Sequence, residues 1–389
     1  MFEKKINKEY LKLCHIIYGG EYFLELEHYK LKEVDFQNSN ITKCVDTLLS
    51  KSGNNDFYCY KSTNSGFSAC LFESIKTNKL VLVYRGTERF GLGENEKDFP
   101  SMMKDVATDL SLLTGSYDEQ FSDSWKFFKA VKEQNPKRKI IIAGQSLGGA
   151  FAQIVAAKEY TINRKKFETH TYNAPGCRHL LDVYDCNTEY DYSFIRNYAV
   201  ANDWCGMFGE HVGETYLINQ IPLNSLDTDD KTEVINNVLF TTHEGIFKYS
   251  KDTMGKIFKK PKDLTQKEAL SLWYFDKNNP LKDYPNLSAF IKDKFPMVNI
   301  PQFDISQNTF IQKTEKFFRD NIPEEIQNSS VAVAVKNAAD EFMRKQAENI
   351  NNFINNSSLV VAIKMLDSVM SELSVEHCER AKAILKRFK

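Results

Sequence analysis

Hydrophobic residues follow two different periodicities along this chain. Short continuous apolar runs, such as those within 79–86 and 139–143, are typical of strands that lie buried in a sheet. Apolar residues three and four positions apart are typical of helices, and they recur in 8–18, in 122–135 and after Leu147. Because strands and helices alternate in this order, we predict an α/β fold in which helices flank a mostly parallel sheet.

The first part of the chain contains the most clearly bounded elements. The predicted helix over 8–18 stops at Gly19 and Gly20. Segments 67–74 and 79–86 have the composition of strands, and a polar Lys-Thr-Asn turn separates them. These two strands are therefore predicted to form a hairpin.

Three later segments predict further strands or buried segments. Residues 165–176 and 195–204 each predict a strand that runs into a loop. Residues 234–242, VINNVLFTT, fit either another strand or a buried apolar segment of another kind. These segments follow the second predicted helix and would extend the sheet.

The composition changes after residue 255. Residues 271–304 are rich in aromatic residues and proline, and residues 315–389 have a mainly helical pattern. We therefore divide the chain into a domain of residues 1–255 and a mainly helical C-terminal region of residues 256–389. The amphipathic helices of this region are expected to pack on one another or on the preceding domain rather than on a membrane.

The charge and composition of the chain limit the classes of partner and site that it can have. The 51 basic and 52 acidic residues give a net charge of -1, so no general field attracts nucleic acid. We recognise no signal peptide and no transmembrane stretch, which favours a soluble protein that is cytoplasmic or exported by a signal-peptide-independent route. The eight cysteines have no paired spacing and are expected to be buried free thiols. No metal site and no cofactor are predicted, and the oligomeric state stays open.

The segment 137–157, KRKIIIAGQSLGGAFAQIVAA, places one serine between a predicted strand and a predicted helix. Ser146 lies at this corner between Gly144 and Gly148, which leave room for the strand and the helix to approach each other. A serine on such a strained turn fits the G-x-S-x-G nucleophile elbow of α/β-hydrolases. The first turn of the helix also offers free backbone N–H groups to a developing anion. Ser146 is therefore the predicted nucleophile.

A serine nucleophile needs a base and an orienting acid, which follow it in the order Ser, Asp or Glu, His in this fold. Asp203 follows an apolar strand and lies in a predicted loop, where a carboxylate can reach an imidazole. Two histidines remain as candidates for the base. His211 opens a predicted strand, whereas His243 closes an apolar segment farther along. Chain order and loop placement favour His243, with His211 as the alternative.

The chain resembles a known family, the class 3 or fungal-type lipases of the α/β-hydrolase superfamily. Its motifs occur in the family's order over about residues 8 to 250: VLVYRGTE, DVATDL, IIIAGQSLGGAFAQ, YNAPG and NDW followed by HVGETYLI. The resemblance implies Ser146 as nucleophile, Asp203 as acid and His243 as base. It also implies an oxyanion hole formed by Thr87 and by the backbone N–H of Leu147.

The resemblance also implies a lid, and the chain departs from the family at one position beside the predicted nucleophile. The segment 88–108 corresponds to the lid of lipases, which would cover an apolar acyl groove and contact a lipid surface when open. Gln145 replaces the histidine that is usual before the nucleophile. We expect this replacement to alter packing under the elbow more than the chemistry.

The predicted function is hydrolysis of carboxylic esters of lipids, by an acylglycerol lipase or a phospholipase. The mechanism would use a Ser-Asp-His triad and an acyl-enzyme, without a cofactor. Two alternatives are a hydrolase of small esters or thioesters and a catalytically inactive lipid-binding or scaffold module. The sequence does not determine the acyl-chain length, the headgroup or the role of residues 256–389.

Overall fold

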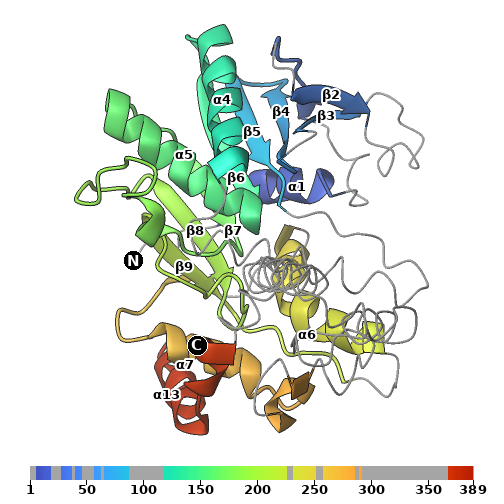
Figure 1. Cartoon of the computed structure of the whole chain (residues 1–389), viewed down its shortest axis with the longest axis vertical. Coiled ribbons are helices and arrows are strands. Elements are labelled where there is room, and N and C mark those ends of the chain that lie inside the picture. The colour runs from blue at the N-terminus through green and yellow to red at the C-terminus, as the bar shows by residue number, and fades with distance from the viewer. Residues whose placement is uncertain are drawn as a thin grey trace, which may run out of the picture.

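A ten-stranded mixed sheet runs through the part of the chain that the structure describes (Figure 1). The structure is a computed structural model, and it describes residues 6–18, 28–36, 40–45, 57–62, 65–86, 118–225, 231–250, 257–284, 289–290 and 367–388. The strands follow the order β10-β9-β8-β7-β6-β5-β4-β3-β2, and β1 pairs with β4 beside this path.

The centre of the sheet is parallel. Its strands are β5 (Lys79–Tyr84), β6 (Lys139–Gln145), β7 (Thr169–Tyr172), β8 (Ile195–Val200) and β9 (Glu214–Ile218). They are mostly buried, because helices cover both faces, and β5 and β6 at the centre are predominantly apolar. The carboxyl ends of β6, β7 and β8 therefore lie at one edge of the sheet, where ligand sites of α/β proteins form.

Antiparallel strands extend the sheet on both sides. They are β1 (Tyr29–Leu31), β2 (Ile41–Val45), β3 (Tyr58–Ser62) and β4 (Ser68–Ser74) on one side and β10 (Phe258–Lys259) on the other. β4 and β5 pair antiparallel across a short turn, so the predicted hairpin is confirmed.

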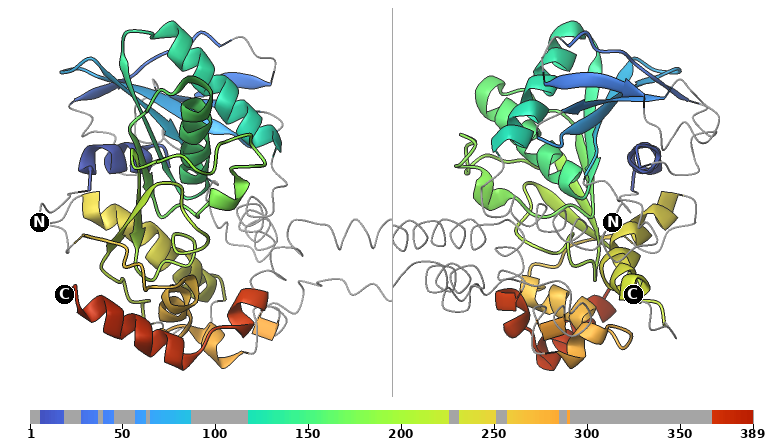
Figure 2. Two further views of the ribbon diagram at one scale, coloured as in Figure 1. Left: turned by 90° about the vertical axis from the view of Figure 1, so that its left-hand side faces the viewer. Right: turned by 45° about the vertical axis from the view of Figure 1, so that its right-hand side comes forward.

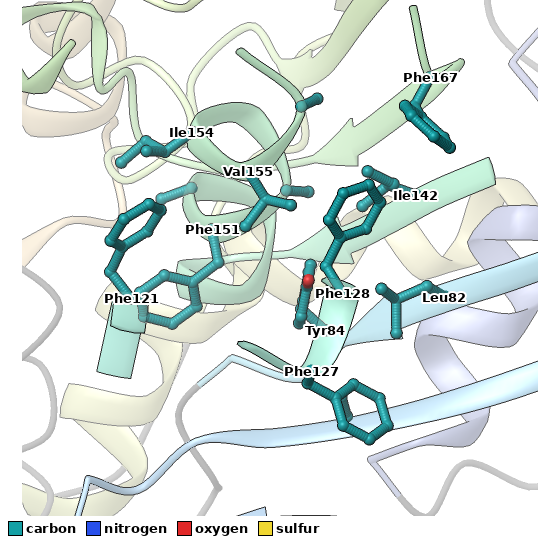
Figure 3. Close-up of a cluster of buried hydrophobic side chains, with 14 of the residues drawn as sticks. Leu82, Tyr84, Phe121, Phe127, Phe128, Ile142, Phe151, Ile154, Val155 and Phe167 are labelled. Carbon is teal, nitrogen blue, oxygen red and sulfur yellow. The ribbon is translucent and has the colours of Figure 1, made fainter. Parts of the chain in front are cut away.

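One face of the sheet is covered by α4 (Asp118–Gln134) and α5 (Leu147–Asn163). Side chains alternate between the two faces of each strand, so Leu82 and Ile142 point to these helices. Figure 3 shows Phe128 of α4 and Phe151 of α5 in the same buried cluster. This packing fixes α5, and with it the turn that precedes α5, against the sheet.

The opposite face carries α1 (Lys8–Ile16), α6 (Lys231–Gly245) and the 3₁₀ turn η5 (Ile246–Ser250). Here Val81 and Val83 of β5 share a hydrophobic cluster with residues of α1 and η5. The predicted helix over 8–18 is confirmed. The strand considered for 234–242 is wrong, because these residues belong to α6, in which Val234, Val238 and Thr242 recur at helical spacing.

A third cluster lies beyond β9. It joins α7 (Gln266–Tyr274) and α13 (Val375–Lys386) to residues of the loop after β8 and of α6. Figures 1 and 2 show α7 and α13 side by side, at the end of the molecule away from α4. Short 3₁₀ turns η4 (Arg178–Leu180) and η6 (Pro280–Asp283) complete the described elements.

The observed sheet, parallel at its centre and flanked by helices, confirms the predicted fold class. The division into 1–255 and 256–389 stays a prediction, although side chains from both parts share one hydrophobic cluster. All eight cysteines are free, and only Cys44 among them is not buried, which agrees with the expected thiols. Within the described ranges, no helix is long and apolar enough to span a bilayer.

Candidate active site

Ser146 occupies the corner between β6 and α5. Its backbone angles are φ 56° and ψ -135°, in a region that a residue with a side chain rarely adopts. The strain is tolerated because the neighbouring backbones are in close contact. A Cβ atom at Gly144 would collide with the carbonyl of Gly148, and one at Gly148 would collide with the carbonyl of Tyr84. The two glycines therefore let the strand and the helix approach each other, as the sequence predicts.

Hydrogen bonds hold this turn in place. The N–H of Ser146 donates to the carbonyl oxygen of Tyr172 at 3.1 Å, and the carbonyl of Ser146 accepts from the N–H of Gly149 at 2.9 Å. α5 begins at Leu147, and the first N–H groups of a helix have no acceptor within the helix. The N–H of Leu147 therefore lies at the start of α5, next to Ser146, and its part in an oxyanion hole stays a prediction. Thr87 and the segment 88–108 lie outside the described residues.

Asp203 lies in the loop after β8, and its side chain is completely buried. The carboxylate accepts three hydrogen bonds. Oδ2 accepts from the N–H of Gly206 at 2.6 Å and from Nδ1 of His243 at 3.1 Å, and Oδ1 accepts from the hydroxyl of Thr242 at 3.3 Å. A buried carboxylate with this many donors is held in one orientation.

His243 lies in the last turn of α6 and is also buried. Because the carboxylate of Asp203 can only accept, Nδ1 of His243 carries the proton and Nε2 carries the lone pair. The side-chain amide of Gln145 lies 3.0 Å from this Nε2 and donates to it. The structure thus joins Asp203 and His243 directly, and it joins the imidazole to the residue that precedes Ser146.

His211, the alternative base, has a different environment. Its Nε2 lies 2.8 Å from the carbonyl oxygen of Ala174. Burial lowers the pKa of His211 to about 4, because desolvation outweighs the hydrogen bond. The ring is therefore neutral near pH 7 and donates to a backbone carbonyl, which is a structural role.

Asn173 is a residue of the site that the sequence reasoning missed. It follows β7 with φ 45°, a conformation that asparagine tolerates better than most residues. Its Nδ2 donates to the carbonyls of Thr242 and His243 at 3.2 and 2.7 Å, and its Oδ1 accepts from the N–H of Val200 at 2.8 Å. Asn173 therefore fastens the end of α6 to β8. The motif YNAPG contained this residue, but no local pattern indicated its partners.

Two tryptophans hold the same helix from the other side. The indole N–H of Trp204 donates to the carbonyl of Leu239 at 2.8 Å, and that of Trp273 donates to the carbonyl of Val238 at 2.9 Å. In a helix these carbonyls also pair with the N–H groups of residues 242 and 243. The ring of Trp204 lies 6.1 Å from that of His243 and 6.4 Å from that of Trp273. Trp273 belongs to α7, so the C-terminal region supports the helix that carries His243.

Tyr18 connects the segment after β5 to the elbow. Its hydroxyl oxygen accepts from the N–H of Gly86 at 2.6 Å, and the hydroxyl donates to the carbonyl of Gln145 at 3.4 Å. A Cβ atom at Gly86 would lie 3.0 Å from the Cβ of Ser146. The chain that leads to Thr87 therefore passes directly beside the serine.

No group of three or more His, Cys, Asp or Glu side chains within the described ranges could hold a metal ion. The thiol of Cys177 is buried against the carbonyl of Ala150, and burial raises the pKa of this thiol.

Comparison with known proteins finds a family match and several structures of low similarity. Residues 81–193 match the family described as lipase (class 3). Lip2 lipase from Yarrowia lipolytica is 16% identical, with 62% of this chain and 92% of that chain covered and a TM-score of 0.34. Lipase II from Rhizopus niveus is 20% identical, with coverages of 51% and 80% and a TM-score of 0.29.

A lipase from Rhizopus microsporus var. chinensis is 15% identical, with a TM-score of 0.28, and the match covers 41% of this chain and 60% of that chain. No curated protein matches the sequence. The family match begins in β5 and includes Ser146 and the whole of α5, whereas Asp203 and His243 follow it in the chain. Within residues 81–193, which match the class 3 lipases, the turn at Ser146 thus lies on the parallel sheet, and over this part the chain is similar to a family of carboxylic ester hydrolases.

Proposed function

We propose that this protein hydrolyses carboxylic esters of lipids through a triad of Ser146, Asp203 and His243. The observation that carries the proposal is the buried hydrogen bond of 3.1 Å between Nδ1 of His243 and Oδ2 of Asp203. Because Nδ1 carries the proton, the lone pair of the imidazole is on Nε2. This nitrogen faces Gln145, the residue that precedes Ser146. This is the arrangement that a serine hydrolase needs for its base.

The proposed reaction has two steps. Nε2 of His243 accepts the hydroxyl proton of Ser146 while Oγ attacks the ester carbonyl carbon, and the proton then passes to the leaving alcohol. Water attacks the resulting acyl-enzyme in the second step while His243 accepts its proton, and the imidazolium then returns this proton to Oγ of Ser146 as the acid is released. Asp203 keeps the imidazole in the required tautomer throughout.

The carbonyl oxygen becomes negative in both tetrahedral intermediates. The N–H of Leu147 and the N–H and hydroxyl of Thr87 are the proposed donors to this oxygen. The strain at Ser146 supports this assignment, because it aims the side chain away from the strand at the point where α5 begins. Loss of one such donor typically costs about 2.7 to 4 kcal/mol in the transition state.

The substrate is proposed to be an acylglycerol or a phospholipid. The match to the class 3 lipases supports a lipid ester, and the segment 88–108, which carries apolar residues such as Phe90 and Phe99, is the proposed lid that contacts the lipid surface. Hydrolysis of esters of increasing acyl length separates this proposal from a small-ester hydrolase. Activity confined to the shortest acyl chains would favour the small-ester hydrolase.

A fluorophosphonate probe tests the triad, because it modifies only a serine that a base activates. We expect labelling at Ser146, none in Ser146→Ala, and a loss of about 10⁴-fold in kcat in Asp203→Asn, which keeps the geometry but not the tautomer. His243→Ala should abolish turnover, whereas His211→Ala should retain it if the variant folds. Turnover lost only in His211→Ala would contradict the assignment of the base.

A further inference from the structure

Gln145 precedes the predicted nucleophile in the chain, and its side chain contacts the predicted base. It is the last residue of β6, and it follows Ile141 and Ala143 on the face of the sheet that α1 and η5 cover. Its side chain is only 3% exposed. The amide is therefore enclosed on the side of the sheet from which α6 brings His243.

The contact between Gln145 and His243 has one consistent proton assignment. Asp203 takes the Nδ1 proton, so Nε2 of His243 must accept, and the group of Gln145 at 3.0 Å is the amide nitrogen, which donates. The sequence suggested that glutamine at this position would alter packing more than chemistry. That expectation did not include this contact of the amide with Nε2 of the proposed base.

An imidazole nitrogen has a single lone pair in the plane of the ring. The Gln145 amide and the Ser146 hydroxyl therefore cannot both donate to Nε2 with good geometry. We propose that Gln145 is a positioning residue that holds His243 in a resting arrangement, and that its amide must turn away before Ser146 can transfer its proton. This inference rests on the proposed function, because it has meaning only if His243 is the base for Ser146.

Such a movement requires no change in the main chain. The main chain of Gln145 is fixed, since it pairs with Tyr172 of β7 and its carbonyl accepts from the hydroxyl of Tyr18. The side chain beyond Cα has three rotatable bonds, and the amide can turn without any movement of β6. The imidazole keeps its orientation when the amide leaves, because Asp203 still accepts from Nδ1.

Two variants of nearly equal size test the proposal in opposite directions. Gln145→Met removes the donor, so we expect a fluorophosphonate to modify Ser146 about three- to tenfold faster, the range that corresponds to one neutral hydrogen bond. Gln145→Glu places a carboxylate beside Nε2. It favours an imidazolium that already carries a proton there, so we expect modification to be more than tenfold slower. A purely structural role would slow both variants.

Gln153 provides the matched control. It is a completely buried glutamine in α5, and its amide donates to the carbonyl of Pro175 at 3.0 Å and accepts from the N–H of Val212 at 3.0 Å. Gln153→Met should lower the thermal unfolding midpoint without accelerating the modification of Ser146 in the folded protein. Equal acceleration in both methionine variants would overturn the proposal.

A measurement on the unmodified protein covers the case in which Gln145→Met does not fold. In protein labelled with ¹⁵N, a hydrogen bond from Nε2 of Gln145 to Nε2 of His243 gives a scalar coupling between the two nitrogens, which should be present at rest and lost after phosphonylation. Absence of this coupling at rest overturns the proposal. If wild-type protein is not labelled at Ser146 at all, the proposed function fails, whereas labelling without acceleration in Gln145→Met refutes only the role of Gln145.

Discussion

The two halves of the candidate site are built in different ways. The elbow half, with Ser146, is formed by consecutive elements of the chain: β6, a turn of one residue, and α5. The base half, with Asp203 and His243, is held by residues that are distant in sequence, such as Asn173 of the β7 loop and Trp273 of α7. The comparison shows that the turn of the proposed nucleophile is built from consecutive elements, whereas the helix of the proposed base is held by distant contacts, including one from Trp273 of α7.

A glycine in each half provides the sharpest test of this difference. In the elbow half, an added Cβ at Gly148 meets backbone atoms of Tyr84 and Arg85, which cannot move independently of β5. We therefore expect Gly148→Ala to destabilise the fold by about 3 kcal/mol and to lower activity strongly.

In the base half, Gly245 ends α6, and an added Cβ there meets only the side chain of Ile221. A side chain can turn aside, and alanine has a higher helix propensity than glycine by up to about 1 kcal/mol. Gly245→Ala should therefore be close to neutral in denaturant unfolding. Equal destabilisation by the two substitutions would contradict the view that only the elbow depends on backbone contact.

The tryptophans test the tertiary support of the base. Trp273→Phe keeps an aromatic ring but removes the N–H that donates to the carbonyl of Val238 in α6. We expect kcat for ester hydrolysis to fall about three- to tenfold with little change in KM, because the loss of one hydrogen bond loosens the helix that carries His243.

Trp125→Phe is the control for the loss of indole size. Trp125 packs on Phe128 in α4, on the opposite face of the sheet from α6. This variant should lose some stability and keep the wild-type kcat. If the two variants reduce kcat equally, the contact between α7 and α6 has no specific effect on the base.

The same difference explains what the sequence could predict. The fold class, the hairpin and the elbow followed from local patterns, since Gly144, Ser146 and Gly148 lie within five residues of one another. The sequence also favoured Asp203 and His243, which the structure places in contact. It did not indicate that α6 is a helix, nor the supporting roles of Asn173 and Trp273. Those roles depend on which distant segments pack together, and no periodicity records that information.

The smallest expected effect concerns His211, which links the loop after β7 to the start of β9 through the carbonyl of Ala174. Desolvation lowers its pKa from 6.5 to about 4, so the unfolded chain binds more protons than the folded protein between these two pH values. The stability that neutral His211 provides is therefore complete above pH 6.5 and is lost as the pH falls towards 4. The buried His170, whose pKa desolvation also lowers, acts in the same direction.

In His211→Asn an amide can still donate to Ala174, but it does not titrate. We expect the variant to unfold within about 1 kcal/mol of the wild type at pH 7.5. Below pH 6.5 its unfolding midpoint should fall less steeply with acidification, and the remaining slope should reflect groups such as His170. Denaturant titrations between pH 4 and 7.5 measure both slopes. Identical slopes would mean that folding does not lower the pKa of His211.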